Sequence, residues 1–243
     1  MKITVIGAGN MGGALIKGWA KAGLAPDLTF TAHTQATLDR ISKACPGVKA
    51  MLDNKAAVQD AEVVLLAVKP WLIDSVIEEI ADVLDTRLLI SVAANARNER
   101  IDVYAMPNIA AEFGQSMTFV EDSNEAETAA RLFAKVGQVQ VVDQKHMAAG
   151  MMMAGCGIAY VMRFLRAMME GGVEMGFYPK DAQQIAMQTM LGAVTLLNET
   201  GLHPEAAIDK VTTPGGVTIK GLNELDHSGF NSAVIRCLKA GLK

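Results

Sequence analysis

The feature that most constrains this chain is a short apolar strand that runs directly into a glycine-rich turn and then into a helix. Residues 2–6 read KITVI, a β-branched run typical of a buried strand. The following residues fit the pattern G-x-G-x-x-G, with glycines at Gly7, Gly9 and Gly12, and a helical pattern covers residues 11–22. Strand, turn and helix in this order form the layout of a dinucleotide-binding βα unit.

Each glycine of this turn has a different expected task. Gly7 permits a tight turn, the missing side chain of Gly9 lets a pyrophosphate approach the backbone, and Gly12 lets the helix pack closely against the sheet. The free N–H groups and the positive dipole end of the helix then face the phosphates. A glycine-rich turn with no ligand is the alternative interpretation.

Strand and helix patterns alternate through the first half of the chain. Such alternation predicts an α/β fold with a doubly wound, mostly parallel sheet of the Rossmann type. Expected strands cover residues 2–6, 28–32, 48–51, 62–68, 87–92, 102–105, 117–120 and 138–142, and expected helices cover 11–22, 37–44, 71–84 and 125–136.

From Lys145 onward the sequence predicts helices and no further strand. A long apolar helical stretch, interrupted by Gly150, Gly155 and Gly157, is expected over residues 146–175. Another helix begins at Pro179 and ends before Gly201. Two shorter helices flank residues 226–229.

We therefore predict two domains, a dinucleotide-binding Rossmann domain over residues 1–143 and an all-helical substrate and dimerisation domain over residues 144–243. A helical bundle this small and this apolar is expected to bury surface against a second copy, giving a homodimer or a higher homo-oligomer. Packing on the first domain alone is the alternative.

Composition and charge argue against several classes of protein. The net charge of -4 and the pI near 5.6 disfavour a nucleic-acid surface, and no basic leader precedes the first strand. No apolar run is expected to reach the roughly 18 residues of a membrane span. Three dispersed cysteines and four dispersed histidines show no metal-ligand spacing, so no metal site is expected. The cysteine usage indicates a reducing, cytoplasmic setting.

The end of the second expected strand bears on the choice of dinucleotide. NAD-binding folds place an acidic residue there to bind the ribose 2′-hydroxyl, but this chain has His33 and Thr34, and its first carboxylate is Asp39. A carboxylate would repel a 2′-phosphate, whereas hydroxyl and imidazole groups donate to one, so the sequence favours NADPH over NADH. No arginine is immediate, because Arg40 lies a full turn or more into the next helix.

Two segments of the first domain follow strands and so are expected at the carboxyl edge of the sheet, where ligands of open α/β folds bind. Residues 67–70 read AVKP; Lys69 is either a ligand contact or a solvated side chain. Residues 106–108 read MPN and are placed to wall a nicotinamide pocket, with Asn108 supplying polar contacts.

Two segments of the second domain carry glycines at helix starts. Residues 154–160 read AGCGIAY, a pattern that serves either ligand approach or a close helix crossing. Residues 211–218 read VTTPGGVT, and the N–H groups at the start of the following helix form a carboxylate receptor. A capped turn, with Thr213 as N-cap and Pro214 as the first helical residue, is the simpler reading and is compatible with the first.

These segments, in this order behind this turn, resemble the pyrroline-5-carboxylate reductase family over nearly the whole chain. The resemblance implies NAD(P)H-dependent reduction of Δ1-pyrroline-5-carboxylate to L-proline, the last step of proline biosynthesis. It also implies a Rossmann domain followed by a helical dimerisation domain, with the substrate site near the subunit interface.

Carried over residue by residue, the resemblance assigns the pyrophosphate to Gly7, Gly9, Asn10, Met11 and Gly12; the 2′-phosphate to His33 and Thr34; the adenosine ribose to Asn54; further dinucleotide contacts to Ala67, Val68, Lys69, Pro70 and Asn108; the substrate carboxylate to Thr213, Gly215, Gly216 and Val217; and the ring nitrogen, as the catalytic contact, to Thr218.

The chain departs from the family pattern around the expected nicotinamide pocket and interface. The departures are Cys156 and Ile158 in place of serine and proline, Asn95 in place of glycine, a shortened segment from Asn95 to Ala105, and Ile109-Ala110 in place of Thr-Pro. Two other functions therefore stay open: a related NAD(P)-linked reductase of another imine or a 2-oxo acid, and a non-catalytic nucleotide-binding regulator.

Overall fold

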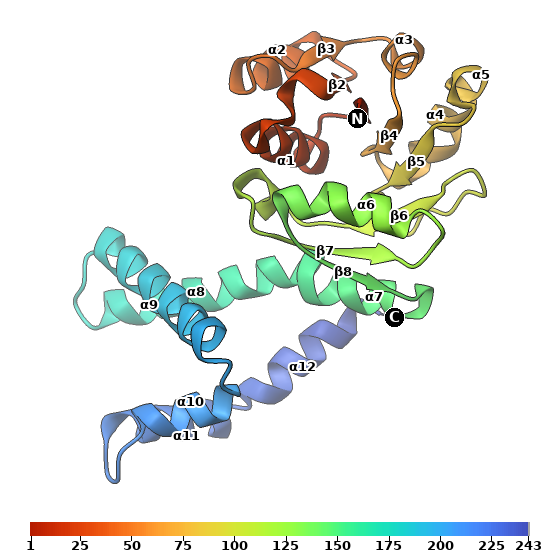
Figure 1. Cartoon of the computed structure of the whole chain (residues 1–243). Coiled ribbons are helices and arrows are strands. Elements are labelled where there is room, and N and C mark those ends of the chain that lie inside the picture. The colour runs from red at the N-terminus through yellow and green to blue at the C-terminus, as the bar shows by residue number, and fades with distance from the viewer. Residues whose placement is uncertain (243) are drawn as a thin grey trace. The chain divides into compact units, whose positions relative to one another are not determined.

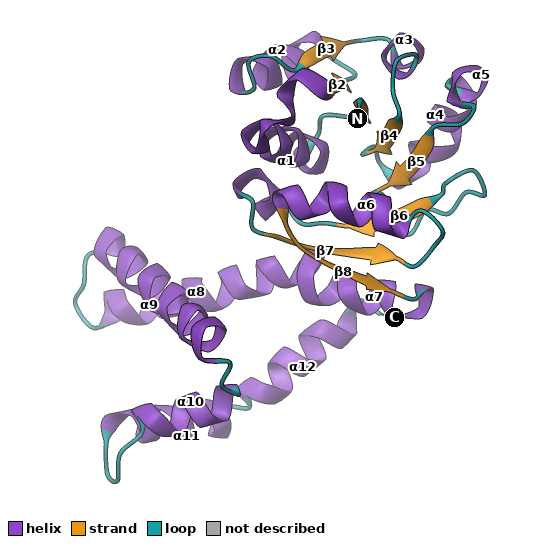
Figure 2. Ribbon diagram, viewed as in Figure 1, coloured by secondary structure: helices purple, strands orange, loops and turns teal. Residues whose placement is uncertain are grey.

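The structure is a computed structural model that describes residues 1–242. It divides into two compact units, Met1–Cys156 and a second that begins at Gly157 (Figure 1). Helices and strands alternate through the first unit, whereas the described part of the second contains helices only (Figure 2). The expectation that no strand follows Lys145 is confirmed for the residues up to 242.

One eight-stranded sheet forms the first unit. Its strands are β1 (Ile3–Ile6), β2 (Leu28–Thr31), β3 (Lys49–Met51), β4 (Val63–Leu66), β5 (Leu88–Ser91), β6 (Val103–Met106), β7 (Ser116–Glu121) and β8 (Gly137–Val142). Their order is β3-β2-β1-β4-β5-β6-β7-β8, and every neighbouring pair is parallel except β6 and β7. The strand order reverses between β1 and β4, so the predicted doubly wound, mostly parallel sheet is confirmed.

Helices cover both faces of this sheet, so its central strands are buried on both sides. The helices of the first unit are α1 (Asn10–Trp19), α2 (Gln35–Ala44), α3 (Asn54–Val58), α4 (Ile73–Glu79), α5 (Ala81–Leu84), α6 (Ala126–Phe133) and α7 (Gln144–Gly150). Because side chains alternate along a strand, Val5 joins the core layer under α1, α2 and α6, whereas Ile6 joins the layer under α3, α4, α5 and α7.

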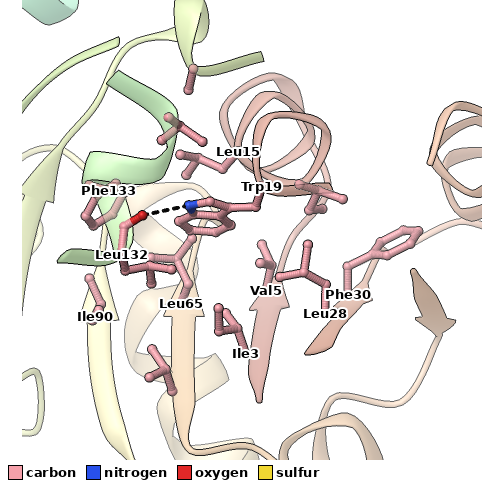
Figure 3. Packing of buried hydrophobic residues seen from close by; sticks show 14 of the residues in the cluster. Ile3, Val5, Leu15, Trp19, Leu28, Phe30, Leu65, Ile90, Leu132 and Phe133 are labelled. Carbon is pink, nitrogen blue, oxygen red and sulfur yellow. Dashed lines mark hydrogen bonds between the residues drawn. The ribbon is translucent and has the colours of Figure 1, made fainter. Parts of the chain in front are cut away.

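Trp19, on the last turn of α1, is the largest side chain in the first of these core layers (Figure 3). It is fully buried, its indole N–H donates to the carbonyl oxygen of Leu132 at 3.0 Å, and its ring lies 5.7 Å from that of Phe133. Since both partners belong to α6, this contact joins the first and sixth helices over the middle of the sheet. A buried indole with its N–H satisfied packs without the cost of an unpaired donor.

The connection between β5 and β6 covers residues 92–102 and contains no helix. Asn95 adopts a left-handed conformation with φ of 59°. Arg97 holds the connection down: its guanidinium lies 4.0 Å from the centre of the Tyr104 ring, and Nη1 donates to Glu121 Oε1 at 2.8 Å. Nη2 lies 2.6 Å from Glu121 Oε2, so the guanidinium contacts both carboxylate oxygens of this ion pair.

Residues 146–175 form the expected interrupted helical stretch, with breaks at Gly150 and before Gly157. The stretch contains α7, a π-helix η6 (Met151–Cys156) and α8 (Gly157–Glu174). By length and composition the continuous stretch Gln144–Glu174 also passes as a membrane span, since an 18-residue window has mean hydropathy 1.4. The expectation that no segment is apolar enough is therefore wrong, although composition alone is weak support for a span.

The helices of the second unit bury few side chains among themselves. After α8 come α9 (Pro179–Thr200), α10 (Pro204–Val211), α11 (Val217–His227) and α12 (Phe230–Ala240). Gly172 lets α8 approach α9, because a Cβ there would lie 3.0 Å from the Cβ of Ala182. Phe164 and Phe230 pack with their rings 5.6 Å apart. No residue of α10, α11 or α12 is buried, so these helices leave apolar surface uncovered, as expected of a unit that packs against a second copy.

Candidate functional site

The glycine-rich turn joins β1 to α1 at the carboxyl edge of the sheet. Gly7 has φ of 98°, a left-handed conformation that glycine alone adopts readily. A Cβ on Gly12 would lie 1.9 Å from the carbonyl oxygen of Gly7, so the two glycines pack backbone against backbone. The structural tasks expected of Gly7 and Gly12, a tight turn and close packing, are thus confirmed.

Gly9 differs from these two, because it faces open space. It is the N-cap of α1, it is exposed, and no heavy atom lies within 4 Å of the position a Cβ would take. No side chain caps this helix and its first turn carries no acidic residue. The first bond into the helix runs from the Gly13 N–H to the Gly9 carbonyl at 2.8 Å, so the N–H groups before it face outward. An open, uncapped, glycine-lined helix start is suited to bind an anion such as a pyrophosphate.

The segment after β4 lies beside this turn. The Ala67 N–H donates to the carbonyl oxygen of Ile6 at 2.9 Å, and the Ala67 carbonyl would lie 2.8 Å from a Cβ on Gly7. Ala67 and Val68 are half-buried, whereas Lys69 is exposed and forms no ion pair with any residue in 1–242. Pro70 then opens a short 3-10 turn, η3 (Pro70–Leu72), which is separate from α4. The helix predicted over residues 71–84 is therefore three short pieces.

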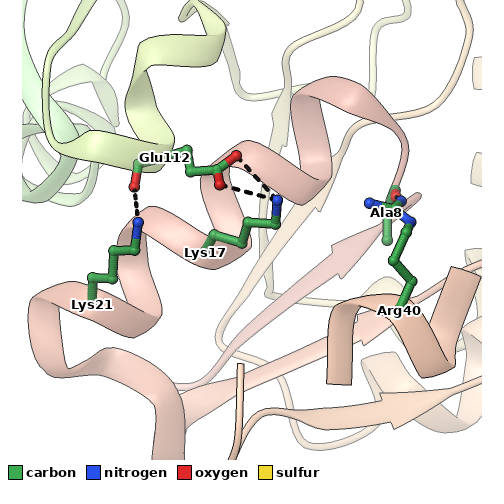
Figure 4. A network of polar contacts seen from close by, with 5 residues as sticks. All are labelled: Ala8, Lys17, Lys21, Arg40 and Glu112. Carbon is green, nitrogen blue, oxygen red and sulfur yellow. Dashed lines mark hydrogen bonds and ion pairs between the residues drawn. The ribbon is translucent and has the colours of Figure 1, made fainter. Parts of the chain in front are cut away.

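Polar side chains follow the end of β2, near the glycine turn. His33 is exposed, and Thr34 is the N-cap of α2, where its Oγ1 accepts from the Thr37 N–H at 3.3 Å. Arg40, expected to be too far along the helix, reaches back to the turn: its Nη2 donates to the Ala8 carbonyl at 3.3 Å (Figure 4). The packing of α2 on α1 sets this distance, and no spacing within the β2–α2 segment gives a signal for it.

Asn54 and Asn108 both use their side-chain amides within the protein. Asn54 begins α3, which was not predicted, and its Nδ2 donates to Glu79 Oε2 at 2.9 Å. Asn108 is 7% exposed; its Oδ1 accepts from the Ala110 N–H at 3.0 Å and its Nδ2 donates to the Ala154 carbonyl at 3.3 Å. Asn108 therefore fixes the segment after β6 to the π-helix η6.

The segment that follows Asn108 is also fixed to α1. It forms a 3-10 helix, η4 (Ile109–Phe113), in which Glu112 accepts hydrogen bonds from two lysines of the first helix and the turn after it (Figure 4). Lys17 Nζ lies 3.1 Å from each carboxylate oxygen, and Lys21 donates to the backbone carbonyl at 2.9 Å. Gly18 permits this contact, because a Cβ there would lie 2.1 Å from the Ala111 carbonyl. The helix of the glycine turn and the segment after β6 thus form one rigid block.

In the second unit, the segment 213–218 forms a tight turn followed by the start of α11. The Gly216 N–H donates to the Thr213 carbonyl at 2.9 Å, and Gly215 has φ of 72°, which with Pro214 before it matches a type II turn. The prediction that Thr213 caps this helix is wrong: Gly216 is the N-cap, α11 begins at Val217, and no side chain caps it. The hydrogen-bonded turn moves the helix start three residues on and exposes Thr213 and Thr218.

None of these segments lines the hollow of about 690 Å³ in the first unit, which lies among the amino ends of β4, β5 and β6 beside Glu62, Arg87 and Asp102. The candidate site is therefore defined by the glycine turn and its neighbours at the carboxyl edge. Within residues 1–242 no group of three acidic, histidine or cysteine side chains is placed to hold a metal ion.

Comparison with known proteins bears on both units. The family model "Pyrroline-5-carboxylate reductase dimerisation" matches residues 144–243, and "NADP oxidoreductase coenzyme F420-dependent" matches residues 2–95. The pyrroline-5-carboxylate reductase of Glycine max is 32% identical over 98% of this chain and 92% of its own length. Pyrroline-5-carboxylate reductase 1 of Dictyostelium discoideum is 34% identical over 96% of this chain, which spans 47% of that protein's length.

A solved structure extends the likeness to the fold. The pyrroline-5-carboxylate reductase of Coxiella burnetii has a TM-score of 0.88 and 28% identity, covering 99% of this chain and 95% of its own. The dimerisation model begins at residue 144, whereas the second compact unit begins at Gly157. The chain belongs to the pyrroline-5-carboxylate reductase family.

Proposed function

We propose that this protein reduces Δ1-pyrroline-5-carboxylate to L-proline, the last step of proline biosynthesis, with NADPH as the preferred hydride donor and NADH as a weaker one. The observation that carries the proposal is the presence of two open, uncapped helix starts in one member of this family. One follows the glycine turn at Gly9, and the other follows the Thr213 turn at Gly216. Each is suited to an anionic group of one reactant, the first to a pyrophosphate and the second to a carboxylate.

The residues of the first unit would hold the dinucleotide. The uncapped N–H groups of α1, at Asn10, Met11 and Gly12, would receive the pyrophosphate over the open face of Gly9. We assign the remaining contacts as follows: His33 and Thr34 to the 2′-phosphate, Asn54 to the adenosine ribose, and Ala67, Val68, Lys69, Pro70 and Asn108 to the rest of the dinucleotide. The absence of an acidic side chain before Asp39 favours NADPH, since a carboxylate there would repel the extra phosphate.

The Thr213 turn would hold the substrate. With the Gly216 N–H already bonded to Thr213, the N–H groups that follow it at the start of α11 have no intrahelical partner. We propose that Thr213, Gly215, Gly216 and Val217 form the carboxylate receptor, and that the Thr218 hydroxyl bonds the ring nitrogen. Thr218 is exposed on the first turn of α11, as such a contact requires.

The proposed reaction does not require a strongly acidic or basic side chain. The dinucleotide, when bound, supplies a hydride to the imine carbon, and the electron pair of the C=N bond moves to nitrogen. A cyclic imine that arrives protonated needs no strong base or acid, so hydroxyl and backbone donors suffice. The chain's task is to align the ring by its two ends and to exclude water.

The test is the oxidation of NADPH with pyrroline-5-carboxylate, with proline identified as the product. Thr218→Val removes the hydroxyl while keeping the shape, and we expect it to lower kcat by about 10- to 100-fold, the value of one transition-state hydrogen bond of ~1.4–2.7 kcal/mol. We expect Thr218→Ser to keep most activity. Thr189→Val, an exposed threonine on α9, is the matched control.

Three outcomes separate the proposed function from its alternatives. Turnover with pyrroline-5-carboxylate supports it. Turnover only with another imine or a 2-oxo acid would assign a related reductase, and dinucleotide binding without turnover on any of them would assign a regulator. An equal loss of NADPH affinity and of turnover in Thr218→Val would contradict the role of Thr218.

We propose that the second unit pairs with that of another copy to form a homodimer or a larger homo-oligomer. Its apolar side chains are exposed to an extent that a soluble chain does not leave uncovered: Met175 is 77% exposed, Tyr178 79% and Val217 85%. The match to a dimerisation family over residues 144–243 supports a second copy as the cover. Light scattering should give at least twice the mass of one chain; a monomer, or partition into the membrane fraction, would contradict it.

We further propose a cytoplasmic location. Cys45, Cys156 and Cys237 are free thiols, which fits a reducing compartment. Titration of the purified protein with a thiol reagent after denaturation should find all three reduced.

A further inference from the structure

The packing of α2 against α1 brings one cation to the glycine turn. Ile41 is fully buried, and a Cβ on Gly13 would lie 3.2 Å from its Cδ1, so α2 lies directly against the start of α1. Arg40 precedes Ile41 and its Nη2 donates to the carbonyl oxygen of Ala8 at 3.3 Å (Figure 4). A guanidinium carries five N–H donors, so one bond to a carbonyl leaves most of its donors available.

The charge of Arg40 is not neutralised by a carboxylate. It forms no ion pair with any residue in 1–242. The adjacent carboxylate, Asp39, accepts instead from Gln35 Nε2 at 2.8 Å. An exposed arginine that is fixed at the turn and lacks a counter-ion is suited to receive a phosphate oxygen.

The other groups near the end of β2 are weaker candidates for this task. Thr34 already accepts from the Thr37 N–H and shares a hydrogen bond of 3.0 Å with the Thr37 hydroxyl. His33 is exposed on the bend that follows β2. Among the polar side chains identified near this turn, Arg40 supplies a guanidinium, whose planar set of N–H donors matches a phosphate.

We infer that Arg40 binds the ribose 2′-phosphate of the dinucleotide and sets the preference for NADPH over NADH. The inference rests on the proposed dinucleotide site but not on the identity of the substrate. NADH lacks the 2′-phosphate, so the energy of this contact appears only with NADPH. The bond to Ala8 holds the guanidinium at the turn before the dinucleotide arrives, so less side-chain entropy is lost on binding.

The test compares the two dinucleotides in the wild-type protein and in Arg40→Ala. A charged hydrogen bond is worth about 1.5–3 kcal/mol, so we expect kcat/KM for NADPH to fall by about 10- to 100-fold and that for NADH to change by less than about twofold. Arg40→Lys should recover part of the NADPH preference. Lys43→Ala, which removes an exposed cation from the last turn of the same helix, is the control for net charge.

A binding measurement keeps the test independent of turnover. By calorimetry, Arg40→Ala should weaken binding of 2′,5′-ADP but leave 5′-AMP, which differs only in the 2′-phosphate, unchanged. Equal losses for both nucleotides would overturn the inference and place Arg40 on another part of the dinucleotide; unchanged binding of both would make it a surface residue. If the protein fails to reduce pyrroline-5-carboxylate, only the proposed function fails, and the nucleotide pair still decides the role of Arg40.

Discussion

Adding one methyl group at Gly9 or at Gly12 should have opposite consequences for stability and for binding. At Gly12 the new Cβ would lie 1.9 Å from the Gly7 carbonyl oxygen, a backbone atom that cannot move without opening the turn. Helix propensity favours alanine by about 1 kcal/mol, while overpacking of this kind costs about 1–3 kcal/mol or more. Because the contact is with backbone, we expect the upper end, a net loss of about 2 kcal/mol and a Tm lower by about 4–8 °C.

At Gly9 the new Cβ would meet no protein atom within 4 Å. Alanine is a poorer N-cap than glycine by up to about 1 kcal/mol, and the reduced freedom of the unfolded chain returns about 0.4–1 kcal/mol. We therefore expect Gly9→Ala to leave the Tm of the ligand-free protein within about 2 °C. The methyl group would occupy the space proposed for the pyrophosphate, so affinity for NADPH should fall by at least about tenfold, or ~1.4 kcal/mol.

Thermal unfolding without ligand and calorimetric titration with NADPH measure both effects. The pair is its own control, since each variant adds the same methyl group three residues from the other. Wild-type affinity for NADPH in Gly9→Ala would refute the assignment of this turn as the pyrophosphate site. An unchanged Tm in Gly12→Ala would refute the claim that the fold requires glycine there.

Three further predictions concern the first unit. Arg97→Ala removes the partly exposed pair with Glu121 and the contact with an aromatic ring, and should lower unfolding free energy in urea by about 1–2 kcal/mol; no change would show that the β5–β6 connection is held otherwise. Asn108→Asp keeps the oxygen that caps η4 but loses the donor to the Ala154 carbonyl, and should lower the unfolding free energy by about 2 kcal/mol in the same assay. An unchanged unfolding free energy would show that this bond does not stabilise the fold. Burial raises the pKa of the Cys45 thiol, with Lys17 opposing the shift, so native Cys45 should resist alkylation at neutral pH. Its contribution to stability is present below the pKa of the unfolded thiol and is lost as pH rises through the folded value; rapid labelling at neutral pH would contradict this.

Most of the sheet could be predicted because its information is local. Most of the eight strands are apolar or alternating runs bounded by turn residues, and the structure contains a strand within each expected range or within a residue or two of it. The glycine spacing likewise requires a strand before it and a helix after it. The antiparallel placement of β7 beside β6 was not foreseen in detail, because the direction of a strand depends on the path of its connection rather than on its own residues.

What the sequence could not supply depends on contacts between distant segments. The distance from Arg40 to the glycine turn follows from the packing of α2 on α1, which no spacing within the β2–α2 segment reveals. The start of α11 was misplaced because Thr213 and Pro214 match a capping pattern, while the bond from the Gly216 N–H makes them a turn. The apolar composition of the second unit indicated surface to bury against another copy, and composition alone could not say which side chains the helices leave exposed.

The most direct test of the central claim is an NADPH-oxidation assay of the purified full chain with pyrroline-5-carboxylate, with proline quantified at the end point. We expect one proline to form for each NADPH consumed, and the rate to fall by about 10- to 100-fold in Thr218→Val. A folded protein that binds NADPH but forms no proline would contradict the proposed function.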